Sequence, residues 1–389
     1  MDREKFTESS PGKLVEISIP KKDWAFVPHP LPPNWKFPEG LWPLLSEAKV
    51  AVARLDGIAQ SLPNPQLLLR PLQSREALRS SSLEGTYATP EELLLFEFQP
   101  REPTSDTDPA NAFLEVANYI SSLRHGLELL NELPICLRLI KGLHQVLLTG
   151  VRGRNKAPGD FRKNQVHIGS DYRFIPPPPN YLDSCLDSFE RALNTDKSPY
   201  DPLVQCYIFH YQLETIHPFL DGNGRVGRVL LSIMIFKLCK LSMPWLYMSA
   251  YFERYKDEYI DNLFRVSSEG DWEAWIEFCL RGTVSQATDS IARCAKLNAL
   301  KDEFHASTEG TGPRDHSIIE GLFSTPMLNV TQTAKRYDVS YPTARSDIKR
   351  LVKLKILTEV LDKYPKVYYC PSIFRIAYRE PDEPREDGE

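Results

Sequence analysis

Twelve consecutive residues, 217–228, read HPFLDGNGRVGR and bring several chemically active side chains close together. The imidazole of His217 titrates near neutrality and can act as a general base. A single carboxylate, Asp221, suits Mg²⁺, which binds one or two protein carboxylates together with phosphate oxygens. Arg225 and Arg228 stand three residues apart, so they share one face of a helix.

The same segment contains Gly222 and Gly224, which allow a tight turn with bare backbone N–H groups. Together with the N-terminus of the helix expected from Gly224, these groups form a concave site for an anion. Each feature alone has an ordinary structural explanation: a helix-end histidine, a turn, a helix cap, a solvated face. Together, a base, a metal carboxylate and a phosphate cradle are the parts needed for phosphoryl or nucleotidyl transfer.

HPFLDGNGRVGR matches every specified position of the Fic family signature H-P-F-x-[D/E]-G-N-G-R-x-x-R, and most of the chain resembles that family. The resemblance implies that His217 deprotonates a hydroxyl of a target protein, which then attacks the α-phosphate of ATP. It assigns Asp221 to Mg²⁺, and Arg225 and Arg228 to the β- and γ-phosphates. The rest of the ATP-binding loop would be Gly222, Asn223, Gly224, Val226 and Gly227.

Two further segments resemble parts of Fic proteins. Residues 158–162 (PGDFR) and the strand-like residues after them resemble the flap that positions the substrate. Residues 248–251 (MSAY) precede Tyr259 and Ile260, which fall where the family binds adenine. Many relatives have two adjacent tyrosines there, so Tyr259 has two interpretations: an adenine contact, or a core aromatic on an amphipathic helix.

A predicted helix ends in the sequence SSSLEG, residues 80–85. A carboxylate in the last helical turn opposes the helix dipole, at a cost of about 0.3–1 kcal/mol, which suggests that another group holds it. The string resembles the inhibitory motif [S/T]-x-x-x-E-[G/N] of the family, with Ser80, Glu84 and Gly85 at its fixed positions. The resemblance implies that Glu84 pairs with Arg228 and takes the cation that the γ-phosphate of ATP needs.

Apolar residues at three-and-four spacing predict a mainly α fold: a Fic helical core with a small β-hairpin flap, plus a C-terminal winged helix-turn-helix domain. Helices are expected at 41–62, 69–83, from 90, twice within 109–149, and at 181–194, 202–216, 224–240 and 252–300. The expected units are a proline-rich arm and helical region with the inhibitory helix at about 69–85 (1–108), a catalytic core (109–300), a linker (301–316), the winged domain (317–378) and an acidic disordered tail (379–389).

Residues 317–378 have the order helix, helix, turn, helix and two short strands, which is typical of a winged helix-turn-helix. Between Asn329 and Lys366, nine basic and four acidic residues give a local charge of about +5 in an otherwise acidic chain. This surplus favours binding to duplex DNA. The same fold also serves in protein contacts and dimerisation, and the sequence leaves both interpretations open.

The chain has 389 residues, 42% hydrophobic and 25% charged, with a formal net charge of −5. This composition predicts a soluble protein of two to three domains and argues against bulk binding to nucleic acid or membrane. The seven cysteines form no C-x-x-C pair, which indicates a reducing cytoplasm and neither a disulfide framework nor a zinc ribbon. The longest apolar run, 229–236, is far shorter than the roughly 20 residues of a membrane span.

The sequence therefore predicts a Mg²⁺- and ATP-dependent protein adenylyltransferase (AMPylase), restrained by Glu84. Its partner would be a target protein with a Ser, Thr or Tyr hydroxyl, or the chain itself, and a homodimer stays open. One alternative is a DNA-binding regulator whose Fic core senses nucleotide. Another is a Fic enzyme that removes AMP or transfers a different phosphate-linked group. His217 favours an enzyme, because a pure sensor needs no base at that position.

Overall fold

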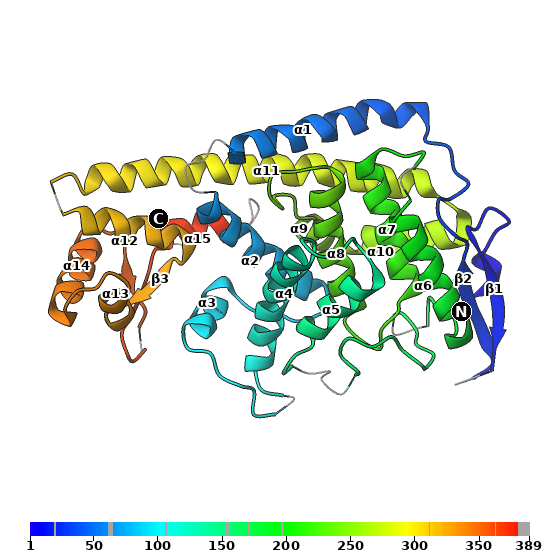
Figure 1. Cartoon of the computed structure of the whole chain (residues 1–389), viewed down its shortest axis with the longest axis horizontal. Coiled ribbons are helices and arrows are strands. Elements are labelled where there is room, and N and C mark those ends of the chain that lie inside the picture. The colour runs from blue at the N-terminus through cyan, green and yellow to red at the C-terminus, as the bar shows by residue number, and fades with distance from the viewer. Residues whose placement is uncertain are drawn as a thin grey trace.

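The computed structural model describes residues 1–18, 21–60, 65–105, 107–151, 156–169, 172–195, 198–310, 312–361 and 363–379. The molecule is mainly helical and elongated (Figure 1). Helices α1 (Trp42–Gln60) and α11 (Trp272–Ser307) lie side by side along one long edge. A β-hairpin from the N-terminal segment lies at one end of the body, and the C-terminal unit lies at the other.

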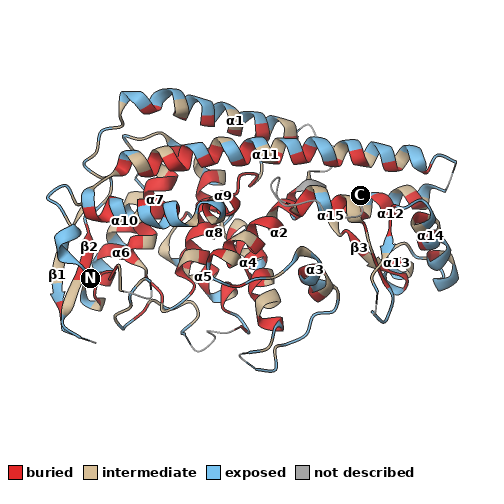
Figure 2. Cartoon of the chain, turned by 180° about the vertical axis from the view of Figure 1, so that it is seen from behind, coloured by how far each residue is buried: buried red, intermediate tan, exposed pale blue. Residues whose placement is uncertain are grey.

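The helices between these two ends form the core that positions the site. In chain order they are α2 (Gln66–Leu83), α3 (Pro90–Phe98), α4 (Ala110–Leu129), α5 (Leu137–Leu147), α6 (Pro179–Leu193), α7 (Pro202–Ile216), α8 (Asn223–Leu238), α9 (Ser249–Arg254) and α10 (Lys256–Glu269). Figure 2 shows α7 and α8 buried on nearly every face, as expected for the central helices of a large core. The loop between them is the HPFLDGNGRVGR segment.

Local sequence signals explain where several of these helices begin and end. Thr89 caps α3 in a reciprocal capping box with Glu92, and Pro90 follows at the first helical position. Asp201 caps α7 by accepting a hydrogen bond from the N–H of Leu203. Helix α10 ends at Gly270, whose φ of 72° stops the helix.

The first forty residues contain more regular structure than the sequence indicates. Strands β1 (Gly12–Ile17) and β2 (Asp23–Pro28) form an antiparallel hairpin, with 3₁₀ turns at Arg3–Lys5 and Glu39–Leu41. The arm packs on the core, because the N–H of Phe26 donates to the carbonyl of Ile175 at 2.8 Å and Thr7 donates to Ser268. Prolines at 11, 20 and 28 mask the alternation that would predict these strands.

Two expectations about the second half of the chain are wrong. The run 252–300 is not one helix: it is the end of α9, then α10, and then α11, which breaks from α10 at Gly270 and continues to Ser307. Most of the expected linker 301–316 is also helical, because α12 (Pro313–Ser324) begins only a few residues after α11 ends. Several polar residues of this segment, such as Asp302 and Glu303, lie on the solvent face of α11, whereas Asp315 on α12 is buried.

The C-terminal unit has the expected order of elements. After α12 come β3 (Met327–Asn329), α13 (Val330–Arg336), α14 (Tyr341–Lys353), β4 (Thr358–Glu359) and β5 (Val367–Tyr369). The strands form one antiparallel sheet in the order β3-β5-β4. A further helix, α15 (Pro371–Tyr378), returns to pack on α2 and α11. The expected disordered tail lies, apart from Arg379, outside the described residues.

The flap region, 156–169 and 172–178, is mostly loop, with one antiparallel bridge between Ile168 and Phe174. No helix among the described residues is long and apolar enough to cross a membrane.

Candidate functional site

The loop from His217 to Gly222 reverses the chain between α7 and α8. His217 ends α7 in the left-handed region (φ 50°), and Gly222 opens α8 with a φ of 75°. The side chain of Asn223 closes the loop: its Oδ1 accepts the N–H of Phe219 at 2.8 Å, and its Nδ2 donates to the carbonyl of Phe219 at 2.9 Å. Asn223 therefore fixes the shape of the loop from within.

His217 is held in the form that a general base needs. Its Nδ1 lies 3.2 Å from the carbonyl oxygen of Glu214, which can only accept, so Nδ1 carries the proton. The Nε2 atom is then the proton acceptor of the ring. Burial lowers the pKa of His217 to about 4, so the imidazole is neutral at pH 7.

Two residues from the flap and α5 hold this loop in place. Arg162, the last residue of PGDFR, is buried and donates from Nε to the carbonyl of His217 at 2.8 Å and from its backbone N–H to Pro218 at 2.9 Å. His144 on α5 accepts the N–H of Gly159 at Nδ1, 2.9 Å, so its Nε2 carries the proton and donates to the carbonyl of Asp221 at 3.0 Å. The sequence gives no signal for His144, because it stands alone on an amphipathic helix.

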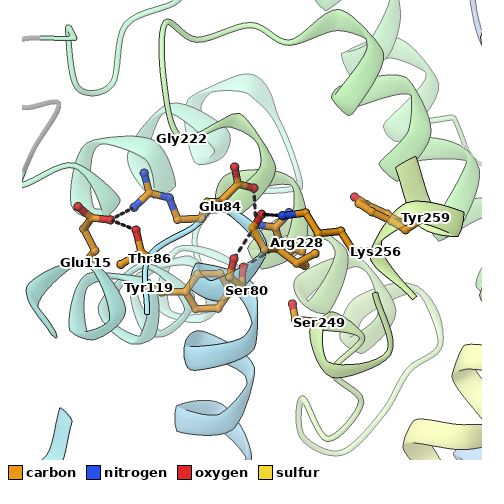
Figure 3. A network of polar contacts seen from close by, with 12 residues as sticks. Ser80, Glu84, Thr86, Glu115, Tyr119, Gly222, Arg228, Ser249, Lys256 and Tyr259 are labelled. Atoms are coloured by element: carbon orange, nitrogen blue, oxygen red, sulfur yellow. Dashed lines mark hydrogen bonds and ion pairs between the residues drawn. The ribbon is translucent and has the colours of Figure 1, made fainter. Parts of the chain in front are cut away.

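Arg228 joins the loop to the end of α2 (Figure 3). Its guanidinium donates from Nε to the Ser80 hydroxyl at 2.8 Å, and from Nη2 to the Ser80 carbonyl at 2.9 Å. The same Nη2 contacts Oε1 of Glu84 at 2.7 Å. Burial opposes ionisation of Glu84, but Arg228 outweighs it and holds the pKa of that carboxyl below its usual range. The expected Glu84–Arg228 contact is thus present in the structure.

The end of α2 is anchored by two further contacts, and Gly224 leaves space beside it. Lys256 donates to the carbonyl of Leu83 at 2.7 Å, which satisfies one of the last carbonyls of the helix. Ser82 donates to Glu253 at 2.6 Å. Gly224 leaves room for Glu84, since a Cβ at this position would collide with Oε1 of that carboxylate.

Arg225, the other expected phosphate ligand, is already paired. Its Nη1 lies 3.1 Å from Oε2 of Glu115, which also accepts the Thr86 hydroxyl at 2.8 Å. Its Nη2 lies 3.9 Å from Asp221. The sequence analysis missed Glu115, because this carboxylate lies 110 residues away in the chain, on α4.

A cavity of about 440 Å³ lies beside these groups. Among the residues predicted from the sequence, its lining includes His217, Gly224, Arg228, Glu84, Tyr259 and Ile260. The other predicted residues, Asp221, Gly222, Asn223, Arg225, Val226 and Gly227, are in the same loop and helix but not in this lining. The cavity thus joins the histidine, the Glu84–Arg228 pair and the expected adenine side in one space.

Both interpretations of Tyr259 have structural support. Its ring is buried and stacks on Phe252, and its hydroxyl lies 2.9 Å from Nε2 of His210, as in a core aromatic. It also lines the cavity, next to the exposed Ile260. Burial lowers the pKa of His210 to about 3, so this ring is neutral and serves the aromatic core.

A carboxylate for which the sequence gives no signal, Glu214, also lines the cavity. Glu214 stands in the last turn of α7, and its Oε1 has no hydrogen-bond partner. Burial raises the pKa of Glu214 to about 7. A Cβ on Gly227 would collide with this oxygen, so Gly227 is needed to accommodate the carboxylate.

The donor set around Asp221 fits Mg²⁺ in the mode that the cation uses with nucleotides. Its carboxylate is half exposed, and Oδ1 accepts only the N–H of Gly222 at 2.6 Å and a distant contact from Arg225. Among the described residues there is no cluster of three or more His, Cys, Asp or Glu that could hold a metal by itself. One carboxylate plus phosphate oxygens and water matches the preference of Mg²⁺.

Comparison with known families and structures agrees with this geometry. Residues 42–128 match the family model described as Fic/DOC family N-terminal, and residues 134–235 match the model described as Fic/DOC family. The Protein adenylyltransferase Fic of Drosophila melanogaster is 31% identical over 153 residues, which are 39% of this chain and 28% of that protein. That of Drosophila yakuba is 36% identical over 110 residues, 28% of this chain and 21% of that protein. The chain thus spans less than a third of the length of these relatives.

Solved structures share the fold at low sequence identity. A Fic family protein from Desulfovibrio desulfuricans G20 is 19% identical, with a TM-score of 0.57 over 87% of this chain and 98% of that chain. Fic-1 from C. elegans is 20% identical, with a TM-score of 0.50 over 64% of this chain and 72% of that chain. The helical architecture is therefore that of these proteins.

Proposed function

This chain carries both the N-terminal domain and the Fic domain of the Fic/DOC family, and we propose that it is a protein adenylyltransferase. It would transfer AMP from ATP to a Ser, Thr or Tyr hydroxyl of a target protein or of itself. The observation that carries the proposal is His217, a neutral imidazole with its Nε2 available as an acceptor, at the mouth of a glycine-rich turn and helix N-terminus. The seven cysteines of the chain are all free thiols, which suits a reducing compartment such as the cytoplasm.

The chain's own residues supply the base and the phosphate site. Nε2 of His217 takes the proton of the target hydroxyl, and that oxygen forms a bond to the α-phosphorus. The bond from the α-phosphorus to the bridging oxygen breaks, and pyrophosphate leaves. The backbone N–H groups at the start of α8, those of Asn223, Gly224 and Arg225, and the guanidinium of Arg228 bind the phosphates. Asp221 would hold Mg²⁺, which neutralises phosphate charge when bound.

Glu84 would restrain this reaction. Its carboxylate contacts Nη2 of Arg228 at 2.7 Å, in the cavity where the γ-phosphate needs a cation. As long as this contact holds, the ATP tail must settle elsewhere, and the α-phosphate turns away from in-line attack. Charge-assisted contacts of this kind are strong enough to compete with a phosphate.

Labelled ATP tests the proposal. The full-length protein is incubated with Mg²⁺ and ATP labelled on either the α- or the γ-phosphate, and labelled protein is detected after electrophoresis. The proposal expects label from α-labelled ATP alone, and none with His217→Ala, which should still bind ATP by calorimetry. Label from γ-labelled ATP would indicate phosphoryl transfer. If wild type and Glu84→Gly protein both bind ATP but neither becomes labelled, the result would favour the nucleotide-sensing regulator.

The variant Glu84→Gly is expected to increase labelling from α-labelled ATP by roughly tenfold or more, since loss of a charge-assisted contact of about 1.5–3 kcal/mol frees Arg228. Glycine is well accepted at this helix end, so the fold should persist. The matched control is Glu132→Gly, an exposed carboxylate in the turn after α4. A Glu84→Gly protein that labels no faster than wild type would show that Glu84 is no brake. Faster loss of AMP from pre-labelled wild type would instead assign AMP removal.

A further inference from the structure

A second cavity, of about 640 Å³, lies between the Fic core and the C-terminal unit. Helices α2, α3 and α4 form its wall on the core side. Helices α12 and α13, strand β3 and the end of α15 form the opposite wall. Its volume falls in the range of roughly 300–1,000 Å³ that is usual for small-molecule sites, which occur preferentially at domain boundaries. We call it the interdomain cleft.

Three arginines from three different elements line the interdomain cleft: Arg70 on α2, Arg124 on α4 and Arg336 on α13. Each is exposed. Within the part of the chain that the structure describes, none of the three has a carboxylate within ion-pair distance, and Arg70 has one long hydrogen bond, 3.3 Å, to the Thr325 hydroxyl. One carboxylate, Glu97, is in the same lining, so three positive charges face one negative charge.

Other arginines, which hold the fold together, are paired with carboxylates. Arg228, Arg225 and Arg350 each contact a carboxylate at 2.7 Å, 3.1 Å and 2.6 Å, respectively. The charges of Arg70 and Arg124 both act on Glu97, but one carboxylate does not balance three guanidinium groups, and solvent or a ligand must compensate the remaining charge. Guanidinium groups suit the oxygens of a phosphate, which they can bind in pairs.

The rest of the lining combines polar side chains, such as Gln73, Asn118 and Gln332, with apolar and aromatic ones. It contains Leu94, Phe96, Phe98, Leu114, Ile318, Leu322, Tyr337 and Tyr378. Guanidinium groups and aromatic rings in one lining fit a ligand that has a flat ring and an anionic group. The volume limits this ligand to about the size of a mononucleotide.

We propose that the interdomain cleft binds a small aromatic phosphate, and that this ligand acts on Glu84 through α2. Arg70 and Glu84 are at opposite ends of α2, 14 residues apart, which is about 21 Å along a helix. The ligand would contact both α2 and α13, so its affinity would depend on the relative position of these two helices. Binding would therefore favour the position for which the affinity is highest. The effect on the reaction rests on the proposed function, whereas binding and the movement of α2 do not.

Polar contacts connect α2 to the C-terminal unit. Arg75 on α2 contacts Asp289 on α11 at 3.0 Å, and Asp289 also accepts from Arg293 at 2.8 Å. Arg293 in turn donates to the carbonyl of Ile376 on α15 at 2.7 Å. Arg75 and Arg293 are buried, so α2, α11 and α15 share one continuous polar network beside the cleft. A shift of the C-terminal unit therefore acts directly on α2.

Calorimetry with 1-naphthyl phosphate, which joins a flat ring to a phosphate, tests the site. The full-length protein should bind it at the cleft, and Arg70→Gln with Arg336→Gln should weaken binding about tenfold or more, because two charge-assisted contacts are lost. Arg191→Gln, an exposed arginine on α6, is the matched control and should bind as wild type does. Ser121→Trp, which fills the cleft from α4 without removing a charge, should also abolish binding.

No saturable binding to wild type at millimolar probe, or equal binding by the double arginine variant, would overturn the site. Hydrogen exchange then tests the link to Glu84 without any measurement of transfer. Saturating probe should lower the protection of residues 80–86, where the N–H groups of Glu84 and Thr86 both bond to the carbonyl of Ser81. Unchanged exchange in this segment, despite binding at the cleft, would overturn the action on Glu84. Either result stands even if the protein transfers no AMP.

Discussion

At the scale of single residues, the proposed reaction depends on the protonation state of His217. Most histidines change charge near pH 6.5, where a base would begin to lose its function. Burial lowers the pKa of His217 to about 4, and the Glu214 carbonyl fixes the proton on Nδ1. Nε2 is therefore ready to accept a proton across the whole neutral range, without help from a neighbouring carboxylate.

The pH dependence of AMP transfer by the Glu84→Gly protein should show that His217 is neutral across the neutral pH range. His217 is a base only when neutral, so its limb of the kcat/KM profile should fall below about pH 5, near the pKa of about 4, and not near 6.5. Glu214 has a pKa of about 7 and lies in the same cavity, so it can add an inflection near neutrality. The additional change Glu214→Gln removes that inflection. An inflection at 6.5 that persists in this double variant would contradict the neutral histidine.

The sequence identifies residues that act within one short segment better than residues that act across the fold. The contact of Glu84 with Arg228 that the motifs predict is present, and Ser80 also bonds to Arg228. Glu115 was missed because it meets Arg225 only after two distant helices pack, with 110 residues between them. His144 and Glu214 were missed for the same reason: what sets them apart is their burial against the loop, and burial arises only in the folded protein.

At the scale of elements, capping signals and apolar spacing predicted most helices of the core. The division between α10 and α11 was missed because apolar spacing continues through it and only the backbone of Gly270, with φ 72°, turns the chain. The strands of the N-terminal hairpin were missed because prolines interrupt their pattern. Helix α15 was missed because its few residues, Pro371–Tyr378, become a helix by packing on α2 and α11.

The basic helix α14 is partly occupied by structural ion pairs. Arg350 contacts both Asp315 and Asp347, and Arg314 also contacts Asp347, which is buried. These pairs fasten α12 to α14 and remove Arg350 from the count of free cations. Arg345, Lys349 and Lys353 stay exposed on the same helix. The interpretation of this unit as a DNA-binding domain therefore depends on fewer charges than the sequence indicates.

If the C-terminal unit binds duplex DNA, Arg345→Ala with Lys349→Ala should weaken that binding and lower the slope of log affinity against log salt by about 2, since each phosphate contact contributes about 0.9. Fluorescence anisotropy of a short labelled duplex with the full-length protein, at several salt concentrations, measures both. Lys296→Ala with Lys301→Ala removes the same charge from α11 and should change neither. No binding of wild type at low salt would leave protein contact as the role of this unit.

At the scale of the whole molecule, three histidines with lowered pKa values link folding to pH. Burial lowers the pKa of His144 and His217 to about 4 and that of His210 to about 3. In the unfolded chain each titrates near 6.5. Between these values the unfolded state binds more protons, so the stability that the neutral rings contribute is complete above pH 6.5 and is lost as pH falls toward 4.

The free energy of unfolding should therefore fall as the pH drops from 7 to 4.5, by up to about 1.4 kcal/mol per pH unit for each histidine. Urea unfolding followed by circular dichroism at several pH values measures it. His144→Asn keeps an acceptor near the position of Nδ1 for the N–H of Gly159 and takes up no proton, so its stability should depend less steeply on pH. An identical slope in this variant would show that His144 is not part of the link.

The pairing of α1 with α11 also has a consequence for how the protein is made. The apolar stripe of α1 (Leu45, Ala48, Val52, Leu55 and Ala59) is buried against a helix that begins at Trp272. At a synthesis rate of about 5–20 residues per second, the stripe waits roughly 10–40 s on the ribosome for its partner. The catalytic loop leaves the ribosome before this closure, and so does Glu84. The nascent chain thus depends on its last long helix to cover its first one.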